Sequence, residues 1–172
     1  QKRFYLWMNI LKKVPDSVLW LMVYLPDARK NILHAASEYG IDPARICFTE
    51  YLSKPDHLKR LQFADLVLDT DLYNGHTSTV DALYVGVPVV TKIGQHFASR
   101  VSASLLKAIE LPELIVESED DYEKLAVRLA TDSAFYQLIA EKLNKNKSST
   151  RLFNSRQHTR QLESLYRQVA FD

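Results

Sequence analysis

The sequence predicts an α/β protein with a mostly parallel, doubly wound sheet of the Rossmann-like kind. Apolar runs of strand length alternate with segments whose apolar residues recur at helical spacing. The connections between them are short, and no tandem repeat, low-complexity tract or heptad run interrupts the alternation. Strands and helices that alternate in this way indicate βαβ units, which build parallel sheets. We expect residues 1–172 to form a single domain.

The first half of the chain contains two such units. Trp7, Ile10, Leu11 and Val14 share one helical face, and the next apolar run is continuous, as in strands buried on both faces. Ser53 is a suitable N-cap for a later helix. The expected elements are a helix ending near residue 14, a strand over 18–24, a helix over 28–39 closed by Gly40, a strand over 45–49 and a helix over 53–64.

The second half continues the alternation. The expected elements are a strand over 66–69, a helix over 77–85 closed by Gly86, a strand over 87–91, a helix over 97–109, a short strand over 114–116 and helices over 120–130, 133–144 and 155–169. The polar, basic stretch 145–151 predicts a linker or exposed turn.

Composition excludes several classes of protein. The chain is 47% apolar and 25% charged with a net charge of +1, so no global charge attracts nucleic acid or a membrane. No apolar run approaches the roughly 20 residues that cross a bilayer, and we expect no signal peptide. The single cysteine, Cys47, excludes an internal disulfide. We expect a reducing, cytoplasmic compartment. Because the chain begins with Gln1 and not Met, we also expect it to be part of a longer protein.

The stretch from Asp69 to Leu83 predicts an anion-binding turn. An apolar strand ends there, a polar loop follows, and a helix begins. Ligands of open α/β sheets bind at the carboxyl ends of strands, and a helix N-terminus offers unpaired N–H groups to a phosphate. Gly75 permits close backbone approach, while His76, Thr77 and Ser78 add side-chain donors. The alternative is an ordinary N-cap of a buried helix, and this stretch alone does not decide between the two.

Two neighbouring segments should reach the same edge of the sheet. Lys54, His57 and Arg60 follow one another at spacings of three, so they share a helical face that suits a nucleotide base and its polar edge. Taken alone, the spacing favours a solvated basic face. Asp81 lies four residues after Thr77, where a carboxylate either accepts from ribose hydroxyls or compensates the helix dipole.

The third segment contributes Arg100, in the first turn of the following helix. Arg100 either contacts a phosphate or sugar or has a structural role, for example by pairing with Asp69, and the structural role is favoured. No HExxH, GxSxG, Walker or GxGxxG motif is present. Asp69 and Asp71 have the spacing of a metal-binding Asp-x-Asp, but they open a loop already rich in phosphate donors. We therefore expect no metal site and no cofactor.

These residues resemble the O-linked N-acetylglucosamine transferase family, which includes the plant SPINDLY proteins and bacterial homologues. The resemblance extends from about residue 7 to residue 166. It rests on segments in the same order: Leu68-Asp69-Thr70, Asn74-Gly75-His76-Thr77-Ser78, Asp81-Ala82-Leu83, Gly86-Val87-Pro88-Val89-Val90-Thr91, Phe97-Ala98-Ser99-Arg100-Val101 and Leu111-Pro112-Glu113-Leu114-Ile115.

The resemblance implies the C-terminal, donor-binding domain of a GT-B glycosyltransferase. It implies a UDP-sugar donor, usually UDP-N-acetylglucosamine, a Ser or Thr of a protein as acceptor, inversion at the anomeric carbon and no metal ion. By the same resemblance, Lys54, His57 and Arg60 lie at the nucleoside and Asp81 holds the ribose. The segment His76-Thr77-Ser78 matches the residues that bind the diphosphate, with Ser78 in place of a Thr. We assign no catalytic residue within this chain.

The chain also departs from the family. Glu110 stands where the family usually has Gly, and Arg151 where Pro is frequent. A strand and a phosphate-binding Lys that precede the first helix in the family are missing here, and so are the N-terminal catalytic half and the tetratricopeptide repeats through which a protein acceptor would be reached. That strand would be central in a sheet of order 3-2-1-4-5-6. We therefore expect this stretch alone to transfer no sugar.

Two alternative functions remain open from the sequence. One is a relative with another donor or acceptor, such as GDP-fucose, or UDP-glucose with asparagine as the acceptor. The other is a non-catalytic module that binds a nucleotide or a partner.

Overall fold

The computed structural model describes residues 2–171 and contains the alternating elements that the sequence predicts. Short 3-10 helices precede β2, α5, β5 and α8. The main elements are α1 (Lys2–Lys13), β1 (Leu19–Met22), α2 (Pro26–Glu38), β2 (Ile46–Thr49), α3 (Lys54–Leu61), β3 (Val67–Leu68), α4 (Thr77–Val85), β4 (Val89–Lys92), α5 (Val101–Ala108), β5 (Ile115–Val116), α6 (Glu119–Thr131), α7 (Ser133–Ser149) and α8 (Ser155–Phe171).

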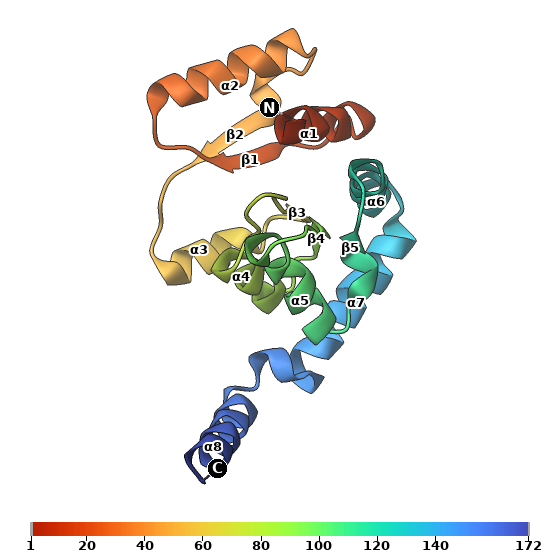
Figure 1. Ribbon diagram of the computed structural model, residues 1–172. Helices are drawn as coiled ribbons and strands as arrows, with labels where there is room; N and C mark the ends of the chain where they lie inside the picture. Colours follow the sequence, from red (N-terminus) through yellow and green to blue (C-terminus); the bar gives the residue numbers. More distant parts are fainter. Residues whose placement is uncertain (1, 172) are drawn as a thin grey trace.

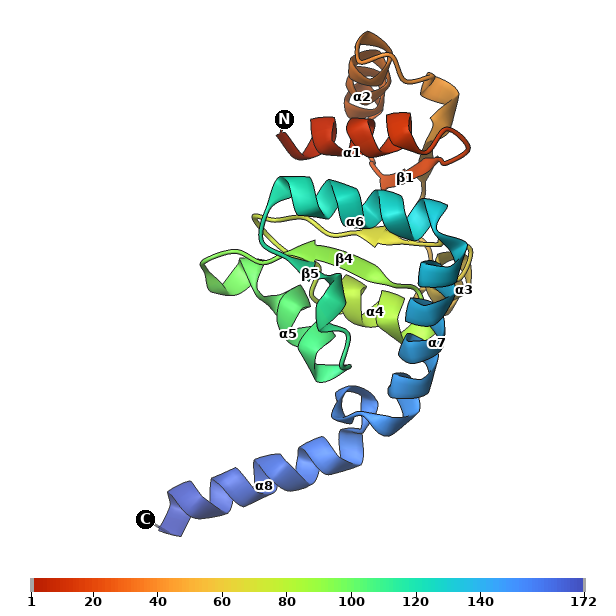
Figure 2. The ribbon, with the colours of Figure 1, turned by 90° about the vertical axis from the view of Figure 1, so that its right-hand side faces the viewer.

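The strands form two parallel sheets, one of β1 and β2 and one in the order β3-β4-β5. The first sheet lies at one end of the molecule with α1 and α2 (Figure 1). The second sheet has α6 on one face and α4 and α5 on the other (Figure 2). All the recorded strand pairs are parallel, so the predicted α/β class with a mostly parallel sheet is confirmed.

A cavity of about 390 Å³ separates the two sheets. It is lined by apolar side chains from β1, β3, α1 and α6, among them Trp20 and Leu68. In a sheet of order 3-2-1-4-5-6 the central strand would lie between the strands that correspond to β1 and β3. The cavity therefore lies where the family resemblance expects a further strand, and that strand stays a prediction.

The prediction of a first strand buried on both faces is wrong. β1 is shorter than expected, and its side chains alternate between half-buried and exposed. Leu19 and Leu21 pack against the core that α1 and α2 share, whereas Trp20 is 40% exposed and Met22 54%. The strand is apolar on both sides, but the helices of this part cover only one of them.

The predicted linker over 145–151 is wrong for residues 145–149, which form the last turns of α7. Asn146 anchors these turns, since its buried side-chain amide donates to the carbonyl of Ile109 at 2.8 Å. This long-range hydrogen bond extends the helix beyond the point suggested by its polar, basic composition. Arg151 lies in a short 3-10 helix immediately after α7.

Several local signals have the structural roles predicted for them. The Ser53 hydroxyl accepts from the backbone N–H of Asp56, as an N-cap does. Gly40 and Gly86 end their helices with φ of +77° and +93°, in the left-handed region that favours glycine.

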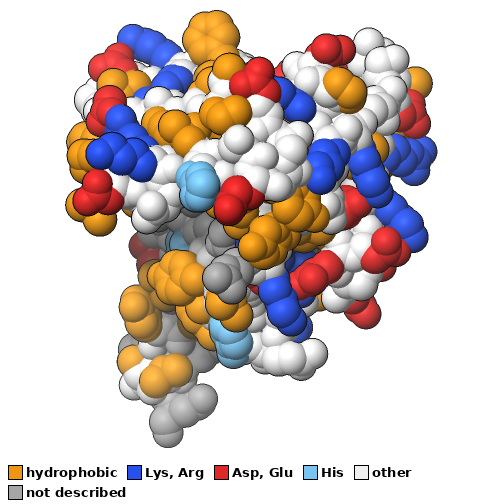
Figure 3. All heavy atoms as spheres, turned by 90° about the horizontal axis from the view of Figure 1, so that it is seen from above, with side chains coloured by type: hydrophobic (Ala, Val, Ile, Leu, Met, Phe, Trp, Pro, Cys, Tyr) orange, Lys and Arg blue, Asp and Glu red, His pale blue; other side chains and the backbone are white. Residues whose placement is uncertain are grey.

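The surface carries both signs of charge. Basic and acidic side chains are interspersed on the face shown in Figure 3, in keeping with the small net charge. α8 extends away from the rest of the chain (Figure 2), with Leu165, Tyr166 and Val169 exposed. Of the helices described between residues 2 and 171, none combines the length and the apolar character needed to cross a bilayer.

The backbone at Glu110 explains why the family usually has Gly at this position, because its φ of +60° lies in the left-handed region. A residue with a Cβ pays about 1–2 kcal/mol there, and glycine does not. We expect Glu110→Gly to raise the free energy of unfolding by about 1 kcal/mol in chemical denaturation. Glu110→Ala keeps the Cβ and should bring no such gain; an equal gain from both variants would assign the effect to the lost charge.

Candidate functional site

Asp69 holds together the turn that follows β3. One of its carboxylate oxygens accepts from the backbone N–H of Gly75 at 2.7 Å, and the other accepts from the Thr91 hydroxyl at 2.6 Å. Asp69 is 5% exposed, so both hydrogen bonds are shielded from water. The carboxylate therefore ties the end of β3 to β4 and folds the loop back toward α4.

Asn74 fixes the other end of this loop. Its backbone N–H donates to the carbonyl of Ala98 at 2.8 Å, and its side-chain amide donates to the carbonyl of Thr70 at 2.6 Å. Its side-chain oxygen accepts from the N–H of Ser102, at 3.4 Å. Asn74 is 1% exposed, so it joins the loop after β3 to the segment that leads into α5.

Gly75 permits a close approach within the protein. A Cβ at this position would lie 2.5 Å from the Thr79 hydroxyl and 2.6 Å from the Ser78 hydroxyl. The Gly75 carbonyl accepts from the hydroxyls of Thr79 and Ser102, and its N–H is taken by Asp69. Gly75 is thus used to seat the turn on α4, and its own N–H is not free for a ligand.

The N-terminus of α4 does offer free donors. Within residues 2–171, no protein acceptor is recorded for the backbone N–H groups of Thr77, Ser78 and Thr79. The side chains of Thr77 and Ser78 are exposed, and His76 occupies the N-cap without a side-chain capping hydrogen bond. Free N–H groups, the helix dipole and two hydroxyls together form a surface suited to an anion.

A second group of polar side chains forms where α3 meets α4. Lys54 Nζ lies 2.5 Å from each carboxylate oxygen of Asp81, and His57 Nε2 lies 3.9 Å from Oδ2 of the same carboxylate. Asp81 is largely buried, while Lys54 is half exposed. Such an ion pair adds little to stability, but it holds a carboxylate and an ammonium group together at the edge of the site.

Arg60 completes this group from the next turn of α3. It donates to the carbonyl of Glu50 at 2.8 Å, and its second terminal nitrogen lies 3.5 Å from His57 Nδ1. Lys54, His57 and Arg60 therefore share one face, as their spacing predicts, and Lys54 and His57 of that face meet Asp81 of α4. The recorded partners of Asp81 both lie on α3, which disfavours the alternative in which this carboxylate serves only the dipole of its own helix.

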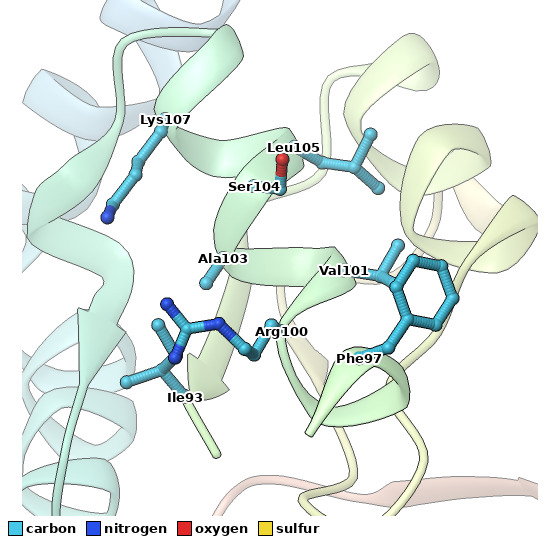
Figure 4. Close-up of a pocket in the computed structure, with 8 residues that line it drawn as sticks. All are labelled: Ile93, Phe97, Arg100, Val101, Ala103, Ser104, Leu105 and Lys107. Atoms are coloured by element: carbon cyan, nitrogen blue, oxygen red, sulfur yellow. The ribbon is translucent and has the colours of Figure 1, made fainter. Parts of the chain in front are cut away.

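Arg100 does not pair with Asp69, the example considered for its structural role. Arg100 donates to the carbonyl of Gly94 at 3.0 Å, while both oxygens of Asp69 already accept from other groups. Arg100 also lines a hollow of about 460 Å³ along α5, together with Ile93 and Lys107 (Figure 4). The structural role expected for Arg100 is the one that these contacts support.

An ion-pair network flanks the turn on its other side. The carboxylate of Asp71 lies 3.1 Å from the guanidinium of Arg3 and 3.3 Å from Lys92 Nζ. Burial acts to raise the pKa of Asp71, but Arg3 and Lys92 outweigh it and hold that pKa below its usual range. Beside them the fully buried Tyr122 donates to the carbonyl of Asp69 at 2.9 Å, and burial raises the pKa of its phenol.

Some residues of the site were not identified from the sequence. Asn74, Ser102 and Tyr122 support the turn, but their contacts are long-range, and no local spacing signals them. Tyr73 and Phe97 flank His76 with their rings. The signal available in the sequence was an aromatic residue within each of two polar segments.

The fold and this edge of the sheet define an α/β domain in which a helix N-terminus suited to an anion lies at the carboxyl ends of parallel strands. A sequence model of glycosyl transferase family 41 matches residues 2–162, and the chain belongs to this family. The chain is 38% identical over 164 residues to a UDP-N-acetylglucosamine–peptide N-acetylglucosaminyltransferase of Caenorhabditis elegans, covering 95% of the chain and 14% of that protein.

Plant relatives and a bacterial structure agree with this assignment. The probable UDP-N-acetylglucosamine–peptide N-acetylglucosaminyltransferase SEC of Arabidopsis thaliana is 37% identical, over 93% of the chain and 16% of its own length. The probable transferase SPINDLY of Solanum lycopersicum is 33% identical, over 95% of the chain and 18% of its own length. The structure of the K341M mutant of Thermobaculum terrenum O-GlcNAc transferase superposes with a TM-score of 0.90 at 29% identity, over 98% of this chain and 33% of that one. The chain thus spans less than a fifth of these curated relatives.

We expect Asp69→Ala to lower the free energy of unfolding by about 2–4 kcal/mol, because it leaves the N–H of Gly75 and the hydroxyl of Thr91 without acceptors. Chemical denaturation measures the loss. Asp120→Ala is the matched control, since Asp120 forms an exposed ion pair with Lys124 and should change stability by less than about 0.5 kcal/mol. Equal effects of the two variants would contradict a structural role for Asp69.

Proposed function

We propose that the chain is the donor-binding part of an inverting, metal-independent glycosyltransferase that transfers N-acetylglucosamine from UDP-N-acetylglucosamine to Ser or Thr of proteins. One observation carries the proposal. Asp81 lies one helical turn beyond the free N–H groups of α4 and is held by Lys54 of α3. In this proposal the nucleoside site at Asp81 and the anion site at the start of α4 are adjacent along one helix, as the two halves of a nucleoside diphosphate are.

Each part of this edge has a role in the proposal. The first turn of α4, with Thr77 and Ser78, receives the diphosphate, and His76 lies beside it. Asp81 accepts from ribose hydroxyls, where the ligand displaces or shares the contact with Lys54. His57 lies against the base, and the guanidinium of Arg60 lies at the polar edge of that base.

This arrangement accounts for leaving-group departure. When the sugar transfers, negative charge develops on the diphosphate. Oriented N–H groups, hydroxyls and the positive end of a helix stabilise such charge without any reorganisation at the moment of reaction. We propose that these donors take the part that a metal ion plays in other transferases. Between residues 2 and 171, no three His, Cys, Asp or Glu side chains are grouped as a metal site would require.

The names of the relatives support the choice of donor and acceptor. The Caenorhabditis elegans and Arabidopsis thaliana proteins are named for transfer of N-acetylglucosamine to peptide. We extend that activity to the whole protein of which this domain is the donor-binding part. We also propose a cytoplasmic location, for which the free thiol of Cys47 is the supporting feature.

We expect UDP to bind the whole native protein and Asp81→Ala or His57→Ala to weaken that binding by about 10- to 100-fold, because each removes a polar contact to the nucleoside. Isothermal titration calorimetry with UDP measures the change. Lys59→Ala is the matched control on α3, since Lys59 is exposed and pairs only with Asp56 among the recorded ion pairs.

The same titrations with GDP and GDP-fucose distinguish the alternatives. A preference for the guanine nucleotides would assign the protein to a relative with another donor. Absence of binding to any of these nucleotides would contradict the proposed function and leave an interaction module.

A second prediction concerns the rate. Ser78→Ala removes one hydroxyl donor from the start of α4 and should lower kcat by about 10²-fold with UDP-N-acetylglucosamine and an acceptor peptide. Ser155→Ala, at the start of the distant α8, is the control and should leave kcat unchanged. A rise in KM at constant kcat would show that Ser78 serves donor binding and not the departure of UDP.

A further inference from the structure

Two aromatic rings contact the side chain of His76, and no hydrogen bond of its imidazole is found in the part of the chain that the structure describes. The ring of Tyr73 stacks on it at 4.9 Å between centroids with an interplanar angle of 15°. The ring of Phe97 meets it edge-on, at 6.0 Å and 88°. Within residues 2–171, the Nε2 atom of His76 is buried and has no hydrogen-bond partner.

The two rings come from different loops that the backbone joins. Tyr73 precedes Asn74, whose N–H donates to the carbonyl of Ala98 at 2.8 Å, and Ala98 follows Phe97. This hydrogen bond places the two loops side by side at the start of α4. Figure 4 shows the ring of Phe97 directed to the side of α5 away from the Arg100 guanidinium.

Core packing does not account for these rings. Tyr73 is 66% exposed and Phe97 79%, so neither buries much surface by its position. The two rings lie together at the start of α4, where both contact the ring of His76. The two rings flank one imidazole, whose Nε2 has no hydrogen-bond partner among residues 2–171, and His76 directly precedes Thr77 and Ser78, whose N–H groups are free.

Resting on the function proposed above, we propose that Tyr73 and Phe97 are positioning residues for His76. They fix the plane of its imidazole so that it is already oriented when the diphosphate reaches α4. Stacked and edge-on aromatic pairs favour defined geometries and contribute beyond the area they bury. An oriented group loses less conformational freedom on binding, so the gain in affinity comes from the part of the ligand that His76 faces.

The proposal predicts a selective effect. Tyr73→Ala and Phe97→Ala should each weaken UDP binding to the whole native protein by about 3- to 10-fold, the size of one aromatic pair. Binding of uridine, which has no diphosphate, should change by less than about twofold, since the nucleoside contacts lie on α3 and at Asp81. Tyr73→Phe keeps the ring and should retain the affinity for UDP. Calorimetry with UDP and uridine measures both ligands.

The controls separate a positioning role from a structural one. Tyr84→Ala removes an exposed ring from the far end of α4, where it meets Phe153 edge-on at 5.6 Å, and should change neither affinity. Tyr73→Leu keeps an apolar side chain without a ring and should behave as Tyr73→Ala does. Unchanged UDP binding in the ring-removing variants, or equal losses for UDP and uridine, would overturn the proposal and leave the proposed function standing. Failure of the unaltered protein to bind UDP would overturn both.

Discussion

The site depends on the carboxylate of Asp69. It accepts from Gly75 and Thr91, while Tyr122 donates to its backbone carbonyl, so one residue connects the end of β3 with β4, with α6 and with the loop before α4. A buried carboxylate is stable only when its oxygens accept hydrogen bonds, and here the loop donates one of them through the N–H of Gly75. The need to satisfy this carboxylate is what directs the free end of α4 to the carboxyl edge of the sheet.

The other half of the site depends on how α3 meets α4. β1 and β2 form a separate sheet from β3-β4-β5, and helices join the two parts: α1 packs on α6, and α3, which follows β2, packs on α4. The ion pair of Lys54 with Asp81 lies on that contact. The proposed nucleoside end of the ligand therefore lies where the two sheets are joined through their helices.

Much of the fold followed from local signals. Ser53, Gly40 and Gly86 marked helix ends because capping and left-handed geometry are properties of a few neighbouring residues. Local signals failed where the decisive contact was distant. The end of α7 is held by a hydrogen bond from Asn146 to Ile109, and the exposure of Trp20 follows from which face the helices cover. Neither can be read from spacing along the chain.

By itself the sequence determined the α/β class, the parallel direction of the strands and the shared face of Lys54, His57 and Arg60, because periodicity and capping are local. It also marked His76, Thr77 and Ser78 as the start of a helix. Only the tertiary structure decided which contacts these loops make. The N–H of Gly75 donates to Asp69, and Arg100 donates to the carbonyl of Gly94. The rings of Tyr73 and Phe97 contact His76. These are contacts between loops after different strands, and parallel topology brings such loops together only when the sheet has formed.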